Sequence, residues 1–313
     1  MSKAEQREVA HEITIGAPAS EVYRLVAEVR NWPRIFPPTI HVDRLEHDGT
    51  EERIRIWATA NGRPKNWTSR RFLDPGALRV EFRQEVSAPP VAEMGGTWII
   101  EPLARETAKV TLLHHYRAVD DDPGSLAWID EAVDRNSRSE LAALKTGAEQ
   151  DSGAGLAVSF EDSVRIDGSA EDVYDFLDEA DRWRERLPHV ARVELTEESP
   201  GVQTLEMDTR TKDGATHTTK SVRVCFPHRE IVYKQITLPA LMSVHTGYWR
   251  LWETDQGVTA VSQHTVVIDP GSIPAVLGPE AGVEEAKKFV RNALGGNSLA
   301  TLGHAKAYAE SRR

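Results

Sequence analysis

Two stretches decide the fold: Ile15-Gly16-Ala17-Pro18-Ala19-Ser20-Glu21-Val22-Tyr23 and Ile166-Asp167-Gly168-Ser169-Ala170-Glu171-Asp172-Val173-Tyr174. They lie 151 positions apart and carry Ile, Ala, Val and Tyr at the same places. The same offset aligns further identical pairs, namely Glu28/Glu179, Trp32/Trp183, Pro37/Pro188, Val42/Val193, Gln84/Gln235, Gly96/Gly247 and Trp98/Trp249. One offset sustained over about 80 residues indicates two copies of one domain in tandem.

Composition limits the classes of function. The 313-residue chain has a formal net charge of −11, which argues against nucleic acid as a partner because phosphate binding requires a basic face. The sequence has no run of 18 apolar residues and no apolar stretch in its first twelve residues, so we expect neither a membrane span nor a secretory signal. A single cysteine, Cys225, excludes an internal disulfide. These features predict a cytoplasmic protein.

Each copy is predicted to open with a strand and a short helix. Residues 9–15 alternate as a strand does, and Val22, Leu25 and Val26 then share one helical face. Strand-like segments follow in the first copy at Val42–Leu45, Glu52–Ala58, Asn66–Phe72, Leu78–Gln84, Gly96–Pro102 and Val110–Val119. Asp-Gly, Asn-Gly and Asp-Pro-Gly turns between these segments indicate antiparallel hairpins.

A long helical pattern closes each copy, from about Ser125 to Glu149 and from about Val283 to Glu310. We therefore predict an α+β fold with domains at residues 1–149 and 157–313, joined by a linker at 150–156. In each domain a curved antiparallel sheet would wrap around the long helix and leave a cavity. The inward side chains of the later strands would line that cavity.

A group of polar residues in the first copy is predicted to face this cavity. Trp67, Ser69 and Arg71 share one face of a strand, and a buried arginine requires a partner. Two candidate partners are His114, on the inward face of its own strand, and Glu140, beside the apolar stripe of the long helix. The alternative is ordinary: an exposed arginine, a core histidine and a solvated glutamate.

The second copy keeps part of this group. With one extra residue in its loop, Ser221, Arg223 and His264 fall on the serine, arginine and histidine of the first copy. The tryptophan and the glutamate become Thr219 and Thr301. This asymmetry predicts that the first copy is the more complete active site.

Three segments carry a resemblance to a known family: Ile35-Phe36-Pro37-Pro38-Thr39, Trp67-Thr68-Ser69-Arg70-Arg71 with Leu73-Asp74-Pro75, and Arg135-Asn136-Ser137. They resemble the aromatase/cyclases of bacterial type II polyketide synthases, and the tandem arrangement resembles the di-domain class of that family. The resemblance covers essentially the whole chain and implies two helix-grip domains of the START/Bet v 1-like type, each with an internal pocket.

The family's activity gives the expected function. Its members receive a poly-β-ketone chain from an acyl carrier protein and catalyse regiospecific first-ring aldol closure and dehydration. The di-domain class implies a C7–C12 closure of a ketoreduced chain, with the minimal synthase and a ketoreductase as further partners. Some members have aspartate at Glu140, and others have tyrosine at Thr39, so a role for that phenol is absent here.

The resemblance assigns roles to residues of the first copy. Arg71 would polarise a ketone, His114 would act as general base and acid, Glu140 would orient or charge-balance that pair, and Ser69 would bind a carbonyl. The expected substrate-binding residues are Trp67, Trp32, Phe36, Thr39, Met94, Trp98 and Asn136. Candidates in the second copy are Ser221, Arg223, His264, Trp183 and Trp249. The chemistry needs no metal or other cofactor.

Several alternatives stay open at this stage. The protein could instead be a non-catalytic carrier or chaperone of hydrophobic ligands, or the second copy could serve as support or perform a second step. Arg63, Lys65 and Arg70 are a candidate dock for the carrier protein. The tandem copies are compatible with a monomer whose two domains form a pseudo-dimer.

Overall fold

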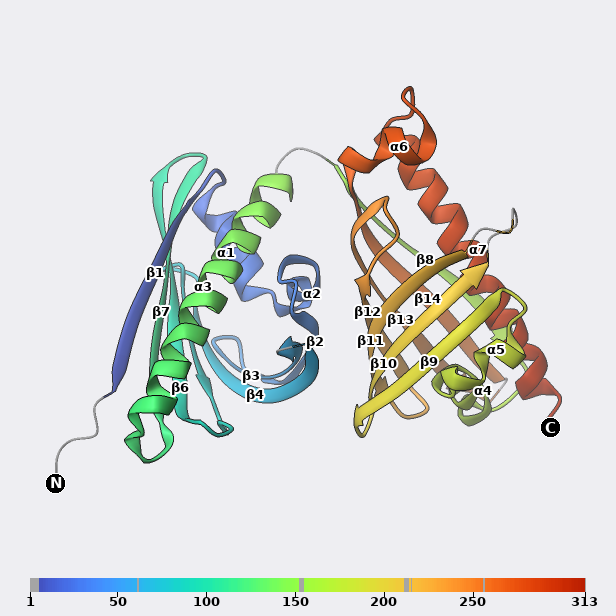
Figure 1. Ribbon diagram of the computed structural model, residues 1–313, viewed down its shortest axis with the longest axis horizontal. Coiled ribbons are helices and arrows are strands. Elements are labelled where there is room, and N and C mark those ends of the chain that lie inside the picture. Colours follow the sequence, from blue (N-terminus) through green and yellow to red (C-terminus); the bar gives the residue numbers. More distant parts are fainter. Residues whose placement is uncertain are drawn as a thin grey trace. The chain divides into compact units, whose positions relative to one another are not determined.

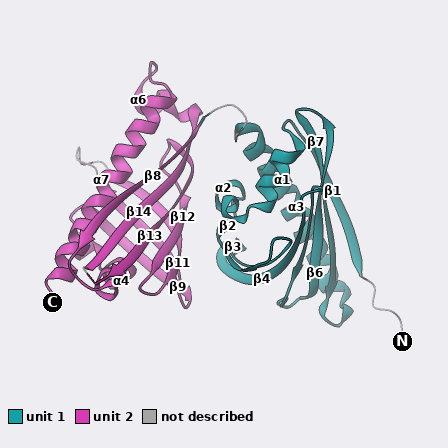
Figure 2. Ribbon diagram, turned by 180° about the vertical axis from the view of Figure 1, so that it is seen from behind, with its two compact units in different colours: residues 1–155 teal, residues 156–313 magenta. Residues whose placement is uncertain are grey.

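The computed structural model describes residues 6–60, 62–151, 155–210, 214, 216–255 and 257–312. The chain divides into two compact units, residues 1–155 and residues 156–313 (Figure 2). The last helix of unit 1 continues to Asp151, two residues into the predicted linker 150–156, and residues 152–154 lie outside the described part of the chain. None of the described helices is long and apolar enough to cross a membrane.

Unit 1 consists of a seven-stranded antiparallel sheet and one long helix, α3, that lies along it (Figure 1). The strand order is β1-β7-β6-β5-β4-β3-β2, a series of hairpins in which the first strand pairs with the last. The elements are β1 (Arg7–Ile15), α1 (Ala19–Ala27), α2 (Trp32–Ile35), β2 (Thr39–His47), β3 (Glu51–Ala60), β4 (Arg63–Asp74), β5 (Arg79–Gln84), β6 (Val91–Ala104), β7 (Thr107–Ala118) and α3 (Pro123–Asp151).

Unit 2 repeats this plan with the strand order β8-β14-β13-β12-β11-β10-β9. It adds one short helix, α6, before its long helix α7 (Figure 1). The elements are β8 (Ala157–Ile166), α4 (Ala170–Asp178), α5 (Trp183–Arg186), β9 (Val190–Ser199), β10 (Val202–Arg210), β11 (Thr216–Phe226), β12 (Glu230–Thr237), β13 (Met242–Thr254), β14 (Gly257–Ile268), α6 (Ile273–Leu277) and α7 (Val283–Glu310).

The first helix of each unit follows from its apolar spacing. Helix α1 buries Val22, Leu25 and Val26 on the face that the sequence predicts. Helix α4 has the same pattern and gains a cap, because the Ser169 hydroxyl accepts a hydrogen bond from the Asp172 N–H at 3.0 Å. These helices cover one end of each sheet, where they place main-chain carbonyls against the arginine on the fourth strand.

The core of unit 1 lies between α1, α3 and the sheet. Leu141 and Leu144 of α3 are buried with Val110 and Leu112 of β7. Burying each such side chain contributes about 1.5–3 kcal/mol, so packing of the α3 stripe holds the helix along the sheet. The position of α3 in turn fixes which of its residues face the sheet interior.

The sequence predicted the strands well but underestimated β6. We expected a strand from Gly96 to Pro102, whereas β6 runs from Val91 to Ala104. The additional residues include Met94, which pairs with Tyr116 of β7 through the main chain. Main-chain pairing of this kind leaves no mark in the apolar periodicity.

Gly96 is required by close packing inside the sheet. A β-carbon at this position would lie 2.1 Å from the Leu113 carbonyl oxygen and 2.6 Å from Cζ of Phe82. The Phe82 ring in turn meets the His114 ring edge-on, at a centroid distance of 5.5 Å. The glycine therefore allows the aromatic ring to lie against the histidine.

Candidate active site

A cavity of about 510 Å³ lies in unit 1 between the sheet and α3. Its wall includes every residue of the first copy predicted as a site residue: Trp32, Phe36, Thr39, Trp67, Ser69, Arg71, Met94, Trp98, His114, Asn136 and Glu140. The sequence did not assign a site role to other wall residues, among them Ile54, Ile56, Phe82, Gln84, Trp128 and Ser137. The two isoleucines alternate on β3, so strand periodicity could have identified them.

Strand β4 turns three of these side chains inward. Ser69 and Arg71 are 4% and 3% exposed, and Trp67 is half-buried on the same face. The Ser69 hydroxyl donates a hydrogen bond to the Arg83 carbonyl of β5 at 3.0 Å. Because its proton is engaged there, Ser69 presents only an acceptor to the cavity.

Arg71 is held by three hydrogen bonds and one ring contact. Its Nη1 donates to Oε1 of Glu52 at 2.7 Å and to the Ala27 carbonyl at 3.3 Å. Its Nη2 donates to the Val26 carbonyl at 2.9 Å, and the guanidinium lies 5.0 Å from the centroid of the Trp32 ring. Burial lowers the pKa of Arg71 to about 10 against the opposing effect of Glu52, so the side chain stays cationic at neutral pH.

The prediction that His114 or Glu140 pairs with Arg71 is wrong. The ion-pair partner is Glu52, which lies directly opposite Arg71 in the β3–β4 register and whose side chain is 0% exposed. The second oxygen of Glu52 forms an ion pair with Nε of Arg44 at 2.7 Å. A buried guanidinium is stable only beside a counter-charge, and here the neighbouring strand supplies it.

His114 lies on β7 and faces the cavity. Its Nδ1 is 3.3 Å from Oγ of Ser137 on α3. Burial lowers the pKa of His114 to about 4, and the neighbouring His11 and His115 act in the same direction. The imidazole is therefore neutral at pH 7, so it can accept a proton through one nitrogen.

Glu140 lies on α3 and forms no hydrogen bond or ion pair with another described residue. The residue is partly buried and lines the cavity. Burial raises the pKa of this carboxyl to about 7. The predicted charge-balancing role is taken by Glu52, and Glu140 is instead a carboxyl that exchanges its proton near neutral pH.

In unit 2 the equivalent arginine forms no ion pair with a carboxylate of the described residues. Arg223 lies opposite Gln203 in the β10–β11 register, as Arg71 lies opposite Glu52. Its Nη2 donates to the Leu177 carbonyl at 2.6 Å. Among the described residues, Nη1 of Arg223 has no hydrogen-bond partner, although the side chain is buried.

The histidine of unit 2 lies inside a closed hydrogen-bonded cluster. Its Nδ1 is 3.0 Å from Oη of Tyr233 and 2.9 Å from Nε2 of His245. Its Nε2 is 2.7 Å from Oγ of Ser298 and 3.1 Å from Oγ of Ser262. All five residues, including His264 itself, are at most 8% exposed. Both nitrogens of this histidine are therefore committed to neighbouring side chains.

Three substitutions distinguish this cluster from the cavity of unit 1. The strand registers place Tyr233, His245 and Ser262 at the positions of Phe82, Met94 and Leu112, respectively. Each change replaces an apolar side chain by one that can hydrogen-bond the histidine.

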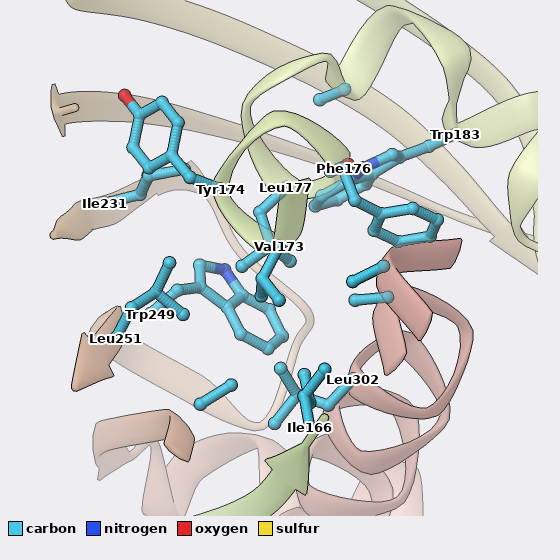
Figure 3. Close-up of a cluster of buried hydrophobic side chains, with 14 of the residues drawn as sticks. Ile166, Val173, Tyr174, Phe176, Leu177, Trp183, Ile231, Trp249, Leu251 and Leu302 are labelled. Carbon is cyan, nitrogen blue, oxygen red and sulfur yellow. Dashed lines mark hydrogen bonds between the residues drawn. The ribbon is translucent and has the colours of Figure 1, made fainter. Parts of the chain in front are cut away.

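The two tryptophans of unit 2 that the sequence singled out belong to its hydrophobic core. Trp183 and Trp249 are 6% and 8% exposed and share a cluster with Val173 and Leu177 of α4 (Figure 3). The Trp183 N–H donates to the Phe176 carbonyl at 3.0 Å. Ser221, the remaining predicted residue, is half-buried on β11. Packing therefore accounts for both indoles.

The candidate basic dock is only partly available. Arg70 pairs with Glu85 at 2.9 Å, which neutralises its charge. Lys65 is exposed and lines the cavity, and Arg63 is exposed nearby on the same strand. Trp128 and Arg135 of α3 also combine exposure with a place in the cavity wall, so these residues mark its mouth.

The whole chain matches a described family. The model of "Polyketide cyclase / dehydrase and lipid transport" matches twice, at residues 6–149 and 157–310. The granaticin polyketide synthase bifunctional cyclase/dehydratase of Streptomyces virginiae is 52% identical over 94% of this chain and 97% of its own length. The actinorhodin polyketide synthase bifunctional cyclase/dehydratase of Streptomyces coelicolor is 47% identical over 99% of both chains.

Solved structures agree with this assignment. The di-domain aromatase/cyclase BexL of the BE-7585A biosynthetic pathway is 66% identical, with a TM-score of 0.93 over 97% of this chain and 99% of its own. The di-domain aromatase/cyclase StfQ of the steffimycin pathway is 35% identical, with a TM-score of 0.88 over the same shares. The chain therefore belongs to the polyketide cyclase/dehydrase family, as a di-domain aromatase/cyclase of polyketide biosynthesis with two helix-grip units.

Proposed function

We propose that unit 1 catalyses the first-ring aldol closure, between C7 and C12, and the following dehydration of a ketoreduced poly-β-ketone bound to an acyl carrier protein. One observation carries this proposal. A single cavity brings together a fixed cation, a neutral imidazole and a carboxyl with a pKa of about 7. These three groups are what enolate formation, carbon–carbon bond formation and loss of water require.

Arg71 stabilises the oxyanions of the reaction. Its contacts to Glu52, Val26 and Ala27 use three of its five N–H groups, and it remains part of the cavity wall. When the remaining N–H groups bind a ketone oxygen, the neighbouring methylene becomes more acidic. The same donors then stabilise the enolate and the aldol alkoxide, as preorganised donors do in other enzymes.

His114 and Glu140 divide the proton transfers because their pKa values lie apart. Neutral His114 accepts the methylene proton while the enolate carbon attacks the distant ketone carbon. Protonated His114 returns this proton to the resulting alkoxide, which becomes the aldol hydroxyl. In the dehydration step His114 removes the adjacent C–H proton, and protonated Glu140 donates to the hydroxyl, which leaves as water. The proton on His114 then restores the acid form of Glu140.

Unit 2 takes no part in the chemistry in this proposal. Both nitrogens of His264 are occupied, and Arg223 contacts a main-chain carbonyl of its own unit. The substrate carrier would dock at the mouth of the unit 1 cavity, beside Lys65 and Trp128. Charge reversal by Lys65→Glu should then raise KM for the carrier-bound substrate.

Product analysis tests the proposal. A reconstituted minimal synthase and ketoreductase would be combined with wild type, Arg71→Ala or Arg223→Ala, each checked by thermal melting. We expect shunt products from Arg71→Ala and the aromatic first ring from Arg223→Ala. The positions of the ring bonds in the wild-type product test the C7–C12 assignment. If Arg71→Ala gives the wild-type product, the chain binds polyketides without the proposed chemistry in unit 1.

A further inference from the structure

We infer that Glu52 is a positioning residue for Arg71, and that the carboxylate at this place distinguishes the working arginine of unit 1 from its copy in unit 2. This inference rests on the proposed function, because it assigns Arg71 its catalytic orientation. Glu52 does not line the cavity. It acts on the substrate only through the guanidinium that it holds.

The geometry around Arg71 is a three-sided clamp. Glu52 holds Nη1 at 2.7 Å, the Val26 carbonyl holds Nη2 at 2.9 Å, and the Trp32 ring lies 5.0 Å from the guanidinium carbon. Two of these anchors are a neutral carbonyl and a ring. Only Glu52 supplies a charge, and charge-assisted hydrogen bonds are roughly twice as strong as neutral ones.

Glu52 is itself held in place. Its side chain is 0% exposed, and its second oxygen lies 2.7 Å from Nε of Arg44 in an ion pair, although neither atom forms a hydrogen bond with a described residue. The β3–β4 register sets Glu52 across from Arg71, so the two strands carry the pair on adjacent backbones. The guanidinium therefore has one low-energy orientation.

Unit 2 has the same pair of strands and the same arginine, but no carboxylate opposite that arginine. Gln203 occupies the place of Glu52, but its Nε2 donates to Asp178 at 3.3 Å. Its Oε1 and Nη1 of Arg223 both lack a hydrogen-bond partner among the described residues. The arginine is thus retained in unit 2 while the contact that would orient it is lost.

Orientation matters because aldol regiochemistry is a choice among many similar ketones. A donor displaced by about 1 Å from the reacting oxygen can cost roughly 100-fold in rate. A polyketide in the cavity of a Glu52 variant would still meet the same walls. Binding should therefore survive while the reacting carbonyl loses its fixed donor.

The test compares Glu52→Gln with wild type. Unit 2 carries the same glutamine–arginine pair at equivalent strand positions, so this exchange is compatible with the fold. We expect the cyclisation rate to fall roughly 100-fold and products to shift to shunts. Affinity for the wild-type aromatic product, measured by quenching of tryptophan fluorescence, should stay near the wild-type value. A merely structural role for Glu52 would instead lower binding and activity together.

Two controls separate the causes. Arg44→Gln removes the ion pair at the second oxygen of Glu52 but leaves the bond to Arg71, so any shift to shunt products should be smaller than that of Glu52→Gln. Gln203→Glu in unit 2 should leave the product unchanged as well. If Glu52→Gln gives wild-type products while Arg71→Ala does not, the positioning role is wrong and the proposed function stands. If neither variant changes the products, the proposed function fails.

A second variant, Glu52→Asp, tests the positioning role if Glu52→Gln does not fold. Should Glu52→Gln melt below the assay temperature, Glu52→Asp keeps the charge and shortens the side chain by one methylene. The positioning role then requires a reduced fraction of aromatic product with retained product binding. Wild-type activity in Glu52→Asp together with a wild-type product distribution would refute it.

Discussion

The two units keep the same serine, arginine and histidine on the same strands, yet the arrangements around them differ. In unit 1 the histidine faces a cavity and the arginine is clamped by a carboxylate. In unit 2 the histidine is enclosed by four hydrogen-bonding side chains, and the arginine has a glutamine opposite it. Catalytic residue types alone do not make a site, because their neighbours decide what remains available for a substrate.

The difference arises from few positions. Three apolar residues of the unit 1 sheet become Tyr233, His245 and Ser262, and one glutamate becomes Gln203. Four side chains hydrogen-bond His264 in this cluster, while Nδ1 of His245 has no hydrogen-bond partner among the described residues. The histidine of unit 1 therefore faces a cavity, whereas that of unit 2 is surrounded by hydrogen-bonding side chains, and the strand order is the same in both units.

The largest expected effect is a loss of kcat on changing a residue of α3, with no loss on changing its equivalent on α7. Glu140→Gln removes the proposed proton donor of unit 1, and kcat should fall by roughly 100-fold or more. Because the acid form is lost as pH rises through the Glu140 pKa of about 7, the wild-type rate should decline above that pH. Thr301→Val, at the equivalent place in unit 2, should change neither. A Glu140→Gln enzyme with the wild-type pH–rate profile would contradict the assignment.

The next effect concerns stability of the two histidine environments. His264→Ala leaves Tyr233 and Ser298 without their partner, which should cost about 2–3 kcal/mol of unfolding free energy. His114→Ala removes one contact of 3.3 Å beside a cavity and should cost less. Urea denaturation of the two variants measures the difference. Equal losses would mean that the cluster in unit 2 is not stabilising.

Acid should weaken unit 2 through the same cluster. Burial lowers the pKa of His245 to about 3 and of His264 to about 4. Below pH 6.5 the unfolded chain therefore binds more protons than the folded one. The contribution of these two histidines to stability should be constant above pH 6.5 and fall as pH drops toward 4, by about 1.4 kcal/mol per pH unit for each histidine. Melting curves of His245→Phe should show a shallower fall.

The smallest effect runs in the opposite direction in unit 1. Burial raises the pKa of Glu140, so the folded state binds more protons than the unfolded state between about pH 4.5 and 7. Stability from this group is present at low pH and is lost as pH rises through that window. Glu140→Gln should be more stable than wild type at pH 8, on the order of 1 kcal/mol after allowance for solvent in the cavity. The advantage should disappear at pH 4.

Sequence patterns predicted much of this molecule because they report local constraints. The offset repeat predicted two copies, and alternation on β4 predicted that Ser69 and Arg71 face inward together. The partner of Arg71 could not be found in this way. Glu52 lies 19 residues earlier, and only the register between β3 and β4 brings the two together.

The ionisation of the site was also beyond the sequence. Glu140 reads as a helix charge, and its raised pKa arises from burial beside a cavity that exists only in the folded sheet. The closed cluster of unit 2 was missed for a related reason. His245 and Ser262 come from different strands and meet only at His264.

Gly96 sets a limit for anyone who would redesign this enzyme. A library aimed at new ring sizes would vary the cavity wall, and Gly96 is not among the wall residues. Yet any side chain there would displace the Phe82 ring and the Leu113 carbonyl. Because the Phe82 ring lies against the His114 ring, the position of His114 would change as well. Gly247 stands in the same relation to Tyr233 in unit 2. The most restrictive position for engineering is therefore one that never touches the substrate.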